Sequence, residues 1–193
     1  MAVEYRRRRE DYARLVIDEI LPAAAREGPA EWNDVFCERG VFTPAESRAI
    51  LDAGKRHGLA PRIHADELAA SGGAQTAAAV GAVSADHLIY VDEAGADAMA
   101  AAGVIATLLP AAAFFLKLGR YAPARMLVAR GVPVALATDV NPGGGFSPSM
   151  PFVMALAAFG MGLTLEEALV AATANGAAAL GRQSSVGSLE PGK

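Results

Sequence analysis

Cysteine is nearly absent from this chain of 193 residues, and Cys37 is the single one. That excludes an internal disulfide and a zinc site built from cysteines. Positive charge is also scarce, because 17 Lys and Arg face 21 Asp and Glu. The formal net charge of −4 leaves no broad basic surface, so we predict no nucleic-acid partner. The one basic run, residues 6–9, is interpreted as a solvated helix face.

The chain also lacks a long, uninterrupted hydrophobic run. Residues 98–116 carry no charge over a length that could span a bilayer, but Gly103 and Pro110 interrupt them. The interruptions predict a helix end, a buried strand over residues 104–109 and a loop. Residues 1–12 show no apolar core of a secretory signal. We therefore expect a cytoplasmic protein with no membrane partner.

What the sequence does contain is a regular alternation of short apolar runs and helical periodicity. Hydrophobic residues make up 53% of the chain and charged residues 20%, typical of one globular domain. The predicted strands lie within residues 34–40, 59–64, 83–88, 104–109 and 132–138. The predicted helices cover residues 4–26, 44–57, 71–81, 93–102, 121–130 and 149–180. Strands that are apolar on both faces and alternate with helices are typical of a parallel sheet covered by helices.

Polar side chains stand at the carboxyl ends of four predicted strands, namely Glu38, His64, His87 and Asp139. Alternating strands and helices fit either an open doubly wound sheet or part of a (β/α)8 barrel. In a barrel these ends converge on one mouth, whereas an open sheet spreads them along an edge. The barrel is favoured, so we predict an α/β fold that forms part of a (β/α)8 barrel.

Three of these residues are candidate metal ligands. His64, His87 and Asp139 offer nitrogen and oxygen donors suited to zinc or iron. A metal bound in this way lowers the pKa of its water to about 7, and a neighbouring carboxylate can move the proton to a leaving nitrogen. Glu67, three residues after His64, is placed to contact a substrate. The spacing indicates a hydrolytic metal site, although a lone histidine at a strand end is more often structural, as is expected for His57.

A glycine-rich loop, VNPGGGFSPSM, follows Asp139. Its backbone N–H groups are unobstructed by side chains, and such loops bind anions, especially ahead of a helix. The alternative is a flexible connector. Because the loop begins two residues after a candidate ligand, we favour carboxylate binding. Phosphate is less favoured because no GK[ST] follows.

Four further segments stand out in the sequence, namely HADEL (64–68), GAVSADHL (81–88), YAPARMLVARGVPVALATDVNPG (121–143) and SLEPGK (188–193). Together they resemble the imidazolonepropionase family of the amidohydrolase superfamily. The resemblance covers essentially the whole chain and implies hydrolysis of the cyclic amide C–N bond of 4-imidazolone-5-propanoate to N-formimidoyl-L-glutamate, a step of histidine degradation. It also implies one Zn²⁺ or Fe³⁺ ion, a small-molecule substrate as partner, and a homodimer at full length.

The resemblance further implies a role for each site residue. His64 and Asp139 would bind the metal, and Asp139 would also shuttle the proton. His87 would polarise the carbonyl and stabilise the oxyanion, while Glu67 would contact the substrate or the attacking water. Asp66 would be a structural partner or would support a ligand. The residues of the loop implied to hold the substrate are Asn141, Gly143 and Gly144.

Two features depart from the family pattern. The early H-x-H metal pair is missing, and Gly144 stands where many relatives have Ser or Thr. We therefore interpret residues 1–182 as about strands four to eight of the barrel, and residues 183–193 as the start of the return to a small β domain. Such a fragment is expected to be inactive alone. The alternatives are another cyclic-amide amidohydrolase or deaminase of the same superfamily, and an inactive half-barrel binding module.

Overall fold

A five-stranded parallel sheet forms the centre of the computed structural model, which describes residues 2–193. The strands are β1 (Trp32–Cys37), β2 (Ala60–Ala65), β3 (Ser84–His87), β4 (Ile105–Leu108) and β5 (Val134–Leu136). They lie side by side in the order of the chain, which is the arrangement of a barrel wall. The five predicted strands and their parallel direction are confirmed.

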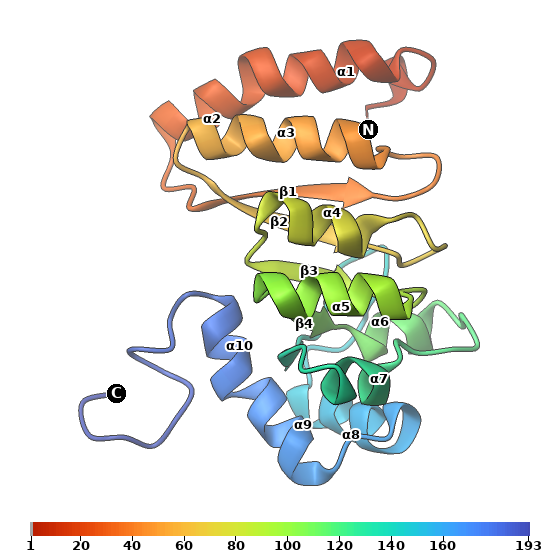
Figure 1. Cartoon of the computed structure of the whole chain (residues 1–193), viewed down its shortest axis with the longest axis vertical. Helices are drawn as coiled ribbons and strands as arrows, with labels where there is room; N and C mark the ends of the chain where they lie inside the picture. Colours follow the sequence, from red (N-terminus) through yellow and green to blue (C-terminus); the bar gives the residue numbers. More distant parts are fainter. Residues whose placement is uncertain (1) are drawn as a thin grey trace.

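Helices cover one face of the sheet in the same order as the strands (Figure 1). One helix follows each of the first three strands, namely α3 (Pro44–Arg56) after β1, α4 (Gly73–Val80) after β2 and α5 (Glu93–Ala102) after β3. Two helices, α6 (Pro110–Phe115) and α7 (Ala124–Ala129), lie between β4 and β5 in the chain. The N-terminal layer comprises η1 (Val3–Tyr5), α1 (Arg9–Leu15), η2 (Val16–Ile20) and α2 (Leu21–Glu27). The C-terminal helices are α8 (Met150–Met161), α9 (Leu165–Ala172) and α10 (Ala174–Ala179), at the β5 end of the sheet.

Of three helical predictions, two need correction and one gains detail. The loop expected after β4 is instead the helix α6, which begins at Pro110 because proline suits the first helical position. The helical character expected over residues 149–180 is confirmed, and it is divided into three helices, since Gly162 ends α8 with a φ of 72° and Thr164 caps α9. The helix expected over residues 4–26 starts at Arg9 and contains a π-helical segment, η2.

The prediction of strands that are apolar on both faces holds for β5, whose three residues are all buried, but is wrong for β1, β2 and β3. Along β2, Pro61, Ile63 and Ala65 are buried under the helices, while Arg62 and His64 point to the opposite, open face. That open face also carries the polar residues Asp34, Asp86 and Thr107 of neighbouring strands. The alternation is that of a sheet with one covered face, as in one wall of a barrel.

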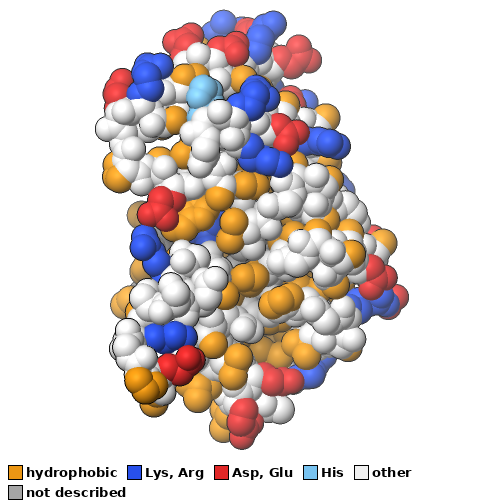
Figure 2. Space-filling model, turned by 60° about the vertical axis from the view of Figure 1, so that its left-hand side comes forward, with side chains coloured by type: hydrophobic (Ala, Val, Ile, Leu, Met, Phe, Trp, Pro, Cys, Tyr) orange, Lys and Arg blue, Asp and Glu red, His pale blue; other side chains and the backbone are white. Residues whose placement is uncertain are grey.

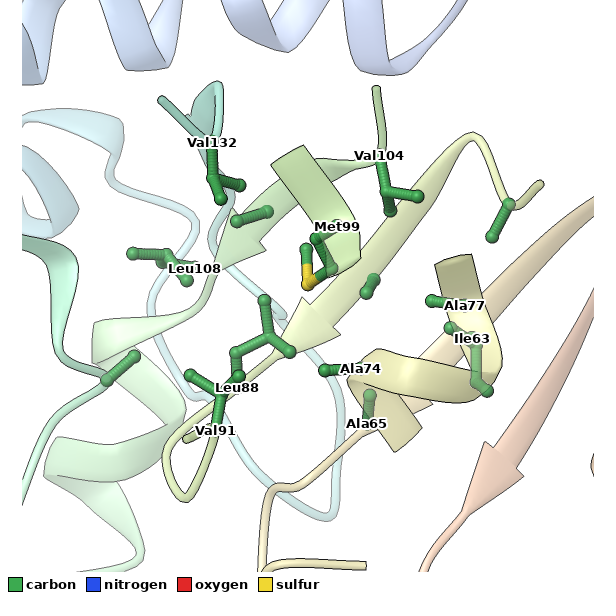
Figure 3. Packing of buried hydrophobic residues seen from close by; sticks show 14 of the residues in the cluster. Ile63, Ala65, Ala74, Ala77, Leu88, Val91, Met99, Val104, Leu108 and Val132 are labelled. Atoms are coloured by element: carbon green, nitrogen blue, oxygen red, sulfur yellow. The ribbon is translucent and has the colours of Figure 1, made fainter. Parts of the chain in front are cut away.

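The hydrophobic core lies between the covered face of the sheet and the helices. Ile63 and Ala65 of β2 pack against Ala74 and Ala77 of α4, and Met99 of α5 lies over the next strand (Figure 3). The side chains are small where helix and strand approach most closely. A Cβ on Gly73, the first residue of α4, would lie 2.7 Å from the Cβ of Ala65, so glycine is required there.

The uncharged run of residues 98–116 is divided among α5, β4 and α6. Within residues 2–193, none of the helices has the length and apolar character needed to cross a membrane. Charged side chains gather at the end formed by the N-terminal helices (Figure 2), where Arg6, Arg7, Arg8 and Arg9 are all exposed. The solvent exposure expected for residues 6–9 is therefore confirmed, but the expected helix face is wrong, because only Arg9 of the four lies in a helix. Residues 183–193 form turns, and their assignment to a second domain stays a prediction.

The outer strands β1 and β5 each have one sheet neighbour within residues 2–193, so each has an open backbone edge. Open edges favour pairing with another chain. One polar group of β5 is covered, because the Asn175 side-chain amide donates to the carbonyl oxygen of Val134 at 2.8 Å. Asn175 therefore protects part of this edge.

We predict that the purified chain associates with itself and that Asn175→Ala strengthens the association. The variant frees a carbonyl on the β5 edge, and light scattering after gel filtration at several concentrations measures the change in mass. Gln183→Ala, which removes an exposed amide elsewhere, is the matched control and should behave like the unchanged chain. A chain that stays monomeric across the concentration range, with or without Asn175, would contradict the prediction.

Candidate functional site

One cavity of about 630 Å³ at the carboxyl ends of the strands collects seven residues singled out from the sequence, whereas Glu38, also expected there, is buried outside its lining. Its lining includes His64, Glu67, His87, Asp139, Asn141, Gly143 and Gly144. The convergence of the strand ends on one mouth is therefore confirmed as geometry. His57 is exposed and lies outside this lining, as expected. The other lining residues are Asp34, Val35, Phe36, Leu68 and Leu116.

The strand ends leave the sheet through left-handed backbone. Asp66 after β2, His87 at the end of β3 and Asp139 after β5 have φ angles of 50°, 73° and 50°. Residues other than glycine rarely adopt this conformation, although Asp and His do so more readily than most. Strained residues of this kind cluster at functional sites, where the surrounding structure holds them in place.

His64 is held by a carboxylate of the neighbouring strand. Its Nδ1 lies 2.8 Å from Oδ2 of Asp34 on β1. The other ring nitrogen of His64, Nε2, therefore points away from Asp34. Burial lowers the pKa of His64, but Asp34, helped by Asp86 and Asp139, outweighs burial and raises the pKa to about 9. The imidazole is therefore positively charged at neutral pH in this structure.

His87 is the opposite case. Burial, reinforced by the positive charge of His64, lowers its pKa to about 3, so the ring is neutral. The two imidazole rings lie 5.2 Å apart. Nδ1 of His87 is 3.6 Å from Oε1 of Glu67, too far for a hydrogen bond, and within residues 2–193 it has no hydrogen-bond partner. This buried nitrogen is therefore left without a hydrogen bond in the described part of the chain, beside the carboxyl group of Glu67.

Two carboxyl groups complete the set of groups that can move protons. Burial raises the pKa of Glu67, and Asp139 and Glu38 add to the effect against the opposing charge of His64. Burial also raises the pKa of Asp139, against His64 and a hydrogen bond from Asn141. Acids with raised pKa values beside a histidine with a lowered one are typical of sites that transfer protons.

Asn141 organises the glycine loop. Its side-chain nitrogen donates to Oδ1 of Asp139 at 2.8 Å, and its side-chain oxygen accepts from the N–H groups of Gly143 at 2.7 Å and Gly144 at 2.9 Å. The N–H groups that the sequence indicated as open to an anion are thus turned onto Asn141 here. A Cβ at Gly144 would lie 3.1 Å from Oδ2 of Asp139, so this glycine leaves space beside the carboxylate.

Asp66 has the expected structural role. Its carboxylate accepts the N–H groups of Ser71 at 2.6 Å, Gly73 at 3.2 Å and Ala74 at 2.9 Å, at the start of α4. It therefore supplies the acceptors that the exposed N–H groups of a helix start require. Asp34 was missed by the sequence prediction. The signal that could have found it is its place on the same face of β1 as Phe36, two residues later.

The assignment of metal ligands stays a prediction. Within residues 2–193, no three His, Cys, Asp or Glu side chains are grouped so that they could hold a metal ion. The set of His64, His87 and Asp139 indicated by spacing is therefore not formed. His64 and Asp139 still fit a metal as part of a ligand set, because His64 pairs its other ring nitrogen with the carboxylate of Asp34. Histidines that bind metals almost always have such a partner.

Comparison with known proteins gives a consistent result. Residues 37–193 match the amidohydrolase family. The chain is 56% identical over 190 residues, 98% of its length, to the imidazolonepropionase of Geobacillus kaustophilus, and 54% identical over the same length to that of Bacteroides fragilis. It covers 45% of each of these relatives, so it spans about half the length of the curated relatives it matches.

Solved structures show the same fold. A zinc-bound adenosine deaminase from Xanthomonas campestris superposes with a TM-score of 0.70 at 25% identity, over 95% of this chain and 46% of the deaminase. A Xaa-Pro dipeptidase superposes with a TM-score of 0.71 at 19% identity, over 94% of this chain and 50% of the dipeptidase. The predicted partial barrel is therefore confirmed, because the chain matches about half of each larger structure.

We predict that His87 makes the fold sensitive to acid. Its pKa falls from an ordinary 6.5 to about 3 on folding, so the unfolded chain binds the proton more readily. Stability from this source is complete above pH 6.5 and is lost as the pH falls toward 3. Urea unfolding between pH 4 and 7 should show a smaller loss for His87→Gln, while the exposed His57→Gln follows the unchanged chain. Parallel curves for all three proteins would contradict the prediction.

We also predict that Asp66→Ala destabilises the fold by about 2–3 kcal/mol, because it leaves several N–H groups without an acceptor near the buried start of α4. Asp92 caps α5 through one backbone N–H, that of Gly95, and lies at a more exposed position. Asp92→Ala is therefore the matched control, expected to cost about 1 kcal/mol. Denaturant unfolding of the two variants should separate them, and equal losses would contradict the role given to Asp66.

Proposed function

The chain belongs to the amidohydrolase family, and on that premise we propose that it carries the catalytic face of an imidazolonepropionase. The reaction is the metal-dependent hydrolysis of the cyclic amide C–N bond of 4-imidazolone-5-propanoate, giving N-formimidoyl-L-glutamate. The observation that carries the proposal is one cavity containing His64, Glu67, His87, Asp139 and Asn141. It occurs in a chain that is 56% identical over 98% of its length to an imidazolonepropionase.

One Zn²⁺ or Fe³⁺ ion would be held by His64 and Asp139 together with further ligands. When bound, it would supply Lewis acidity and lower the pKa of a water molecule. The Asp34 carboxylate supports this assignment, since it holds Nδ1 of His64 and leaves the other ring nitrogen as the donor. The ion binds in competition with the proton that His64 carries in this structure, so occupancy should fall as the pH falls.

Asp139 is the proposed proton carrier. Its raised pKa makes it a stronger base than an ordinary aspartate, and the hydrogen bond from Asn141 fixes its orientation. It would take a proton from the attacking water and give it to the ring nitrogen that leaves. The proton therefore ends on the product's nitrogen, and the carboxylate is restored for the next turnover.

His87 and Glu67 would act on the substrate itself. A neutral, buried imidazole can donate one N–H to the carbonyl oxygen as negative charge develops there, without itself carrying charge into the site. Glu67 would accept a ring N–H or orient the water, and Asn141, Gly143 and Gly144 would hold the substrate beside Asp139. Binding of an acidic substrate would require the loop N–H groups to turn from Asn141 toward the ligand.

The test is a fusion of this chain to the remaining part of the Geobacillus kaustophilus imidazolonepropionase. Loss of the substrate's ultraviolet absorbance should show hydrolysis, and a panel of other cyclic amides and of deaminase substrates should react more slowly. Asp139→Asn should lower kcat by about 10²–10⁴-fold, because the proton carrier is lost. A fusion that binds metal fully but prefers another substrate, or hydrolyses none, would overturn the proposal.

A second prediction separates metal binding from substrate binding in the same fusion protein. His64→Ala should lower the bound metal measured by mass spectrometry, because a ligand is removed. Asn141→Ala should leave the metal content near normal and raise KM instead. His57→Gln is the control and should change neither quantity. If both site variants lost metal equally, the division between ligand and substrate loop would be wrong.

A further inference from the structure

Glu38 is a buried carboxylate that the mechanism above does not use. It follows the last residue of β1 and is 2% exposed. Within residues 2–193 it forms no ion pair with a Lys, Arg or His side chain. Burying a carboxylate without a cation is costly unless hydrogen-bond donors satisfy its oxygens. Its burial directly behind Glu67, a residue that lines the cavity, therefore requires an explanation.

The donors to Glu38 come from the loop that follows β2. Oε1 accepts the backbone N–H of Glu67 at 2.6 Å, and Oε2 accepts the hydroxyl of Ser71 at 3.2 Å. Glu38 thus reaches from one strand to the loop after the next strand. The shorter of its two bonds is made to the residue whose side chain lines the cavity.

Two buried acids hold this loop, and they do different things. Asp66 accepts N–H groups at the start of α4 and so fixes the far end of the loop. Its own backbone is left-handed, with a φ of 50°, and Glu67 follows directly. A strained turn persists only where its surroundings determine it, and the bond from Glu67 to Glu38 fixes the residue just after the turn.

The position of Glu67 in turn sets the pair that faces the substrate. Oε1 of Glu67 lies 3.6 Å from Nδ1 of His87, with side-chain exposures of 11% and 3%. A shift of the Glu67 backbone would move this carboxyl relative to the imidazole. We propose that Glu38 is a positioning residue, whose buried carboxylate fixes the Glu67 N–H and thereby the apposition of Glu67 and His87.

The chain allows a direct test, because it contains only His57, His64 and His87. Long-range proton–nitrogen NMR spectra of the ¹⁵N-labelled chain, at one pH, resolve their ring nitrogens, and His57→Gln and His64→Gln assign them. In the unchanged chain, Glu67→Gln should shift the Nδ1 signal of His87. The same change made in a Glu38→Ala background should shift it by less than half as much.

Two matched variants separate positioning from simple packing. Glu38→Gln retains an oxygen that can accept the Glu67 N–H, so the full Glu67-dependent shift should return. Of the two bonds to Glu38, Ser71→Ala removes only the longer one, so this variant should also keep the full shift. A folded Glu38→Ala chain that keeps the full shift would overturn the proposal.

A second measurement keeps the proposal testable if Glu38→Ala does not fold. Amide hydrogen exchange in the unchanged chain and in Glu38→Gln should show a protected Glu67 N–H. A Glu67 amide that exchanges as fast as that of an exposed loop would overturn the proposal without any disruptive variant.

The proposal rests on the proposed function only for its catalytic consequence. In the fusion enzyme, Glu38→Ala should lower kcat/KM by at least tenfold with bound metal unchanged, and Glu38→Gln should restore most of it. Unchanged kcat/KM in Glu38→Ala would refute the positioning role in catalysis. A fusion that is inactive even with Glu38 intact would count against the proposed function, while the NMR result would still decide the contact between Glu67 and His87.

Discussion

The register of the parallel strands is the constraint on which the site depends. Phe36, His64, Asp86 and Thr107 are paired across four neighbouring strands and stand in one row on the open face. Successive side chains of a strand point to opposite faces, so a slip of one residue would place Ile63 in the cavity and His64 under the helices. The close contact of Gly73 with Ala65 helps to prevent such a slip, because it fixes α4 against β2.

The open face that carries this row also determines the charges in the site. His64 lies among the carboxylates of Asp34, Asp86 and Asp139, which together keep it charged. That charge is one reason why the adjacent His87 stays neutral. Two identical side chains, with rings 5.2 Å apart, therefore have opposite protonation states. The difference arises because the Asp34 carboxylate outweighs burial at His64, whereas burial dominates at His87 and leaves it as an uncharged hydrogen-bonding group.

The sequence was sufficient to predict what depends on local pattern. The apolar runs located all five strands, and polar residues at their ends located the cavity. Contacts between distant residues were not predictable in this way. The pairing of Asp34 with His64, and the capture of glycine N–H groups by Asn141, depend on strand register and on side-chain rotamers. The two-faced character of the sheet was missed because Ile63 and its buried neighbours dominate the hydrophobic pattern of β2.

Proton transfer and metal retention place different demands on this structure. Proton transfer needs only apposed groups with suitable pKa values, and Glu67, His87 and Asp139 meet that need within one cavity. Metal retention needs three or more ligands, and residues 2–193 do not bring three together. The buried acids Glu38 and Asp66 hold the loop that carries Glu67 through backbone hydrogen bonds, and these bonds do not depend on a metal. The geometry of the groups proposed to move protons is therefore a property of this fold itself, whereas a complete metal site requires further donors.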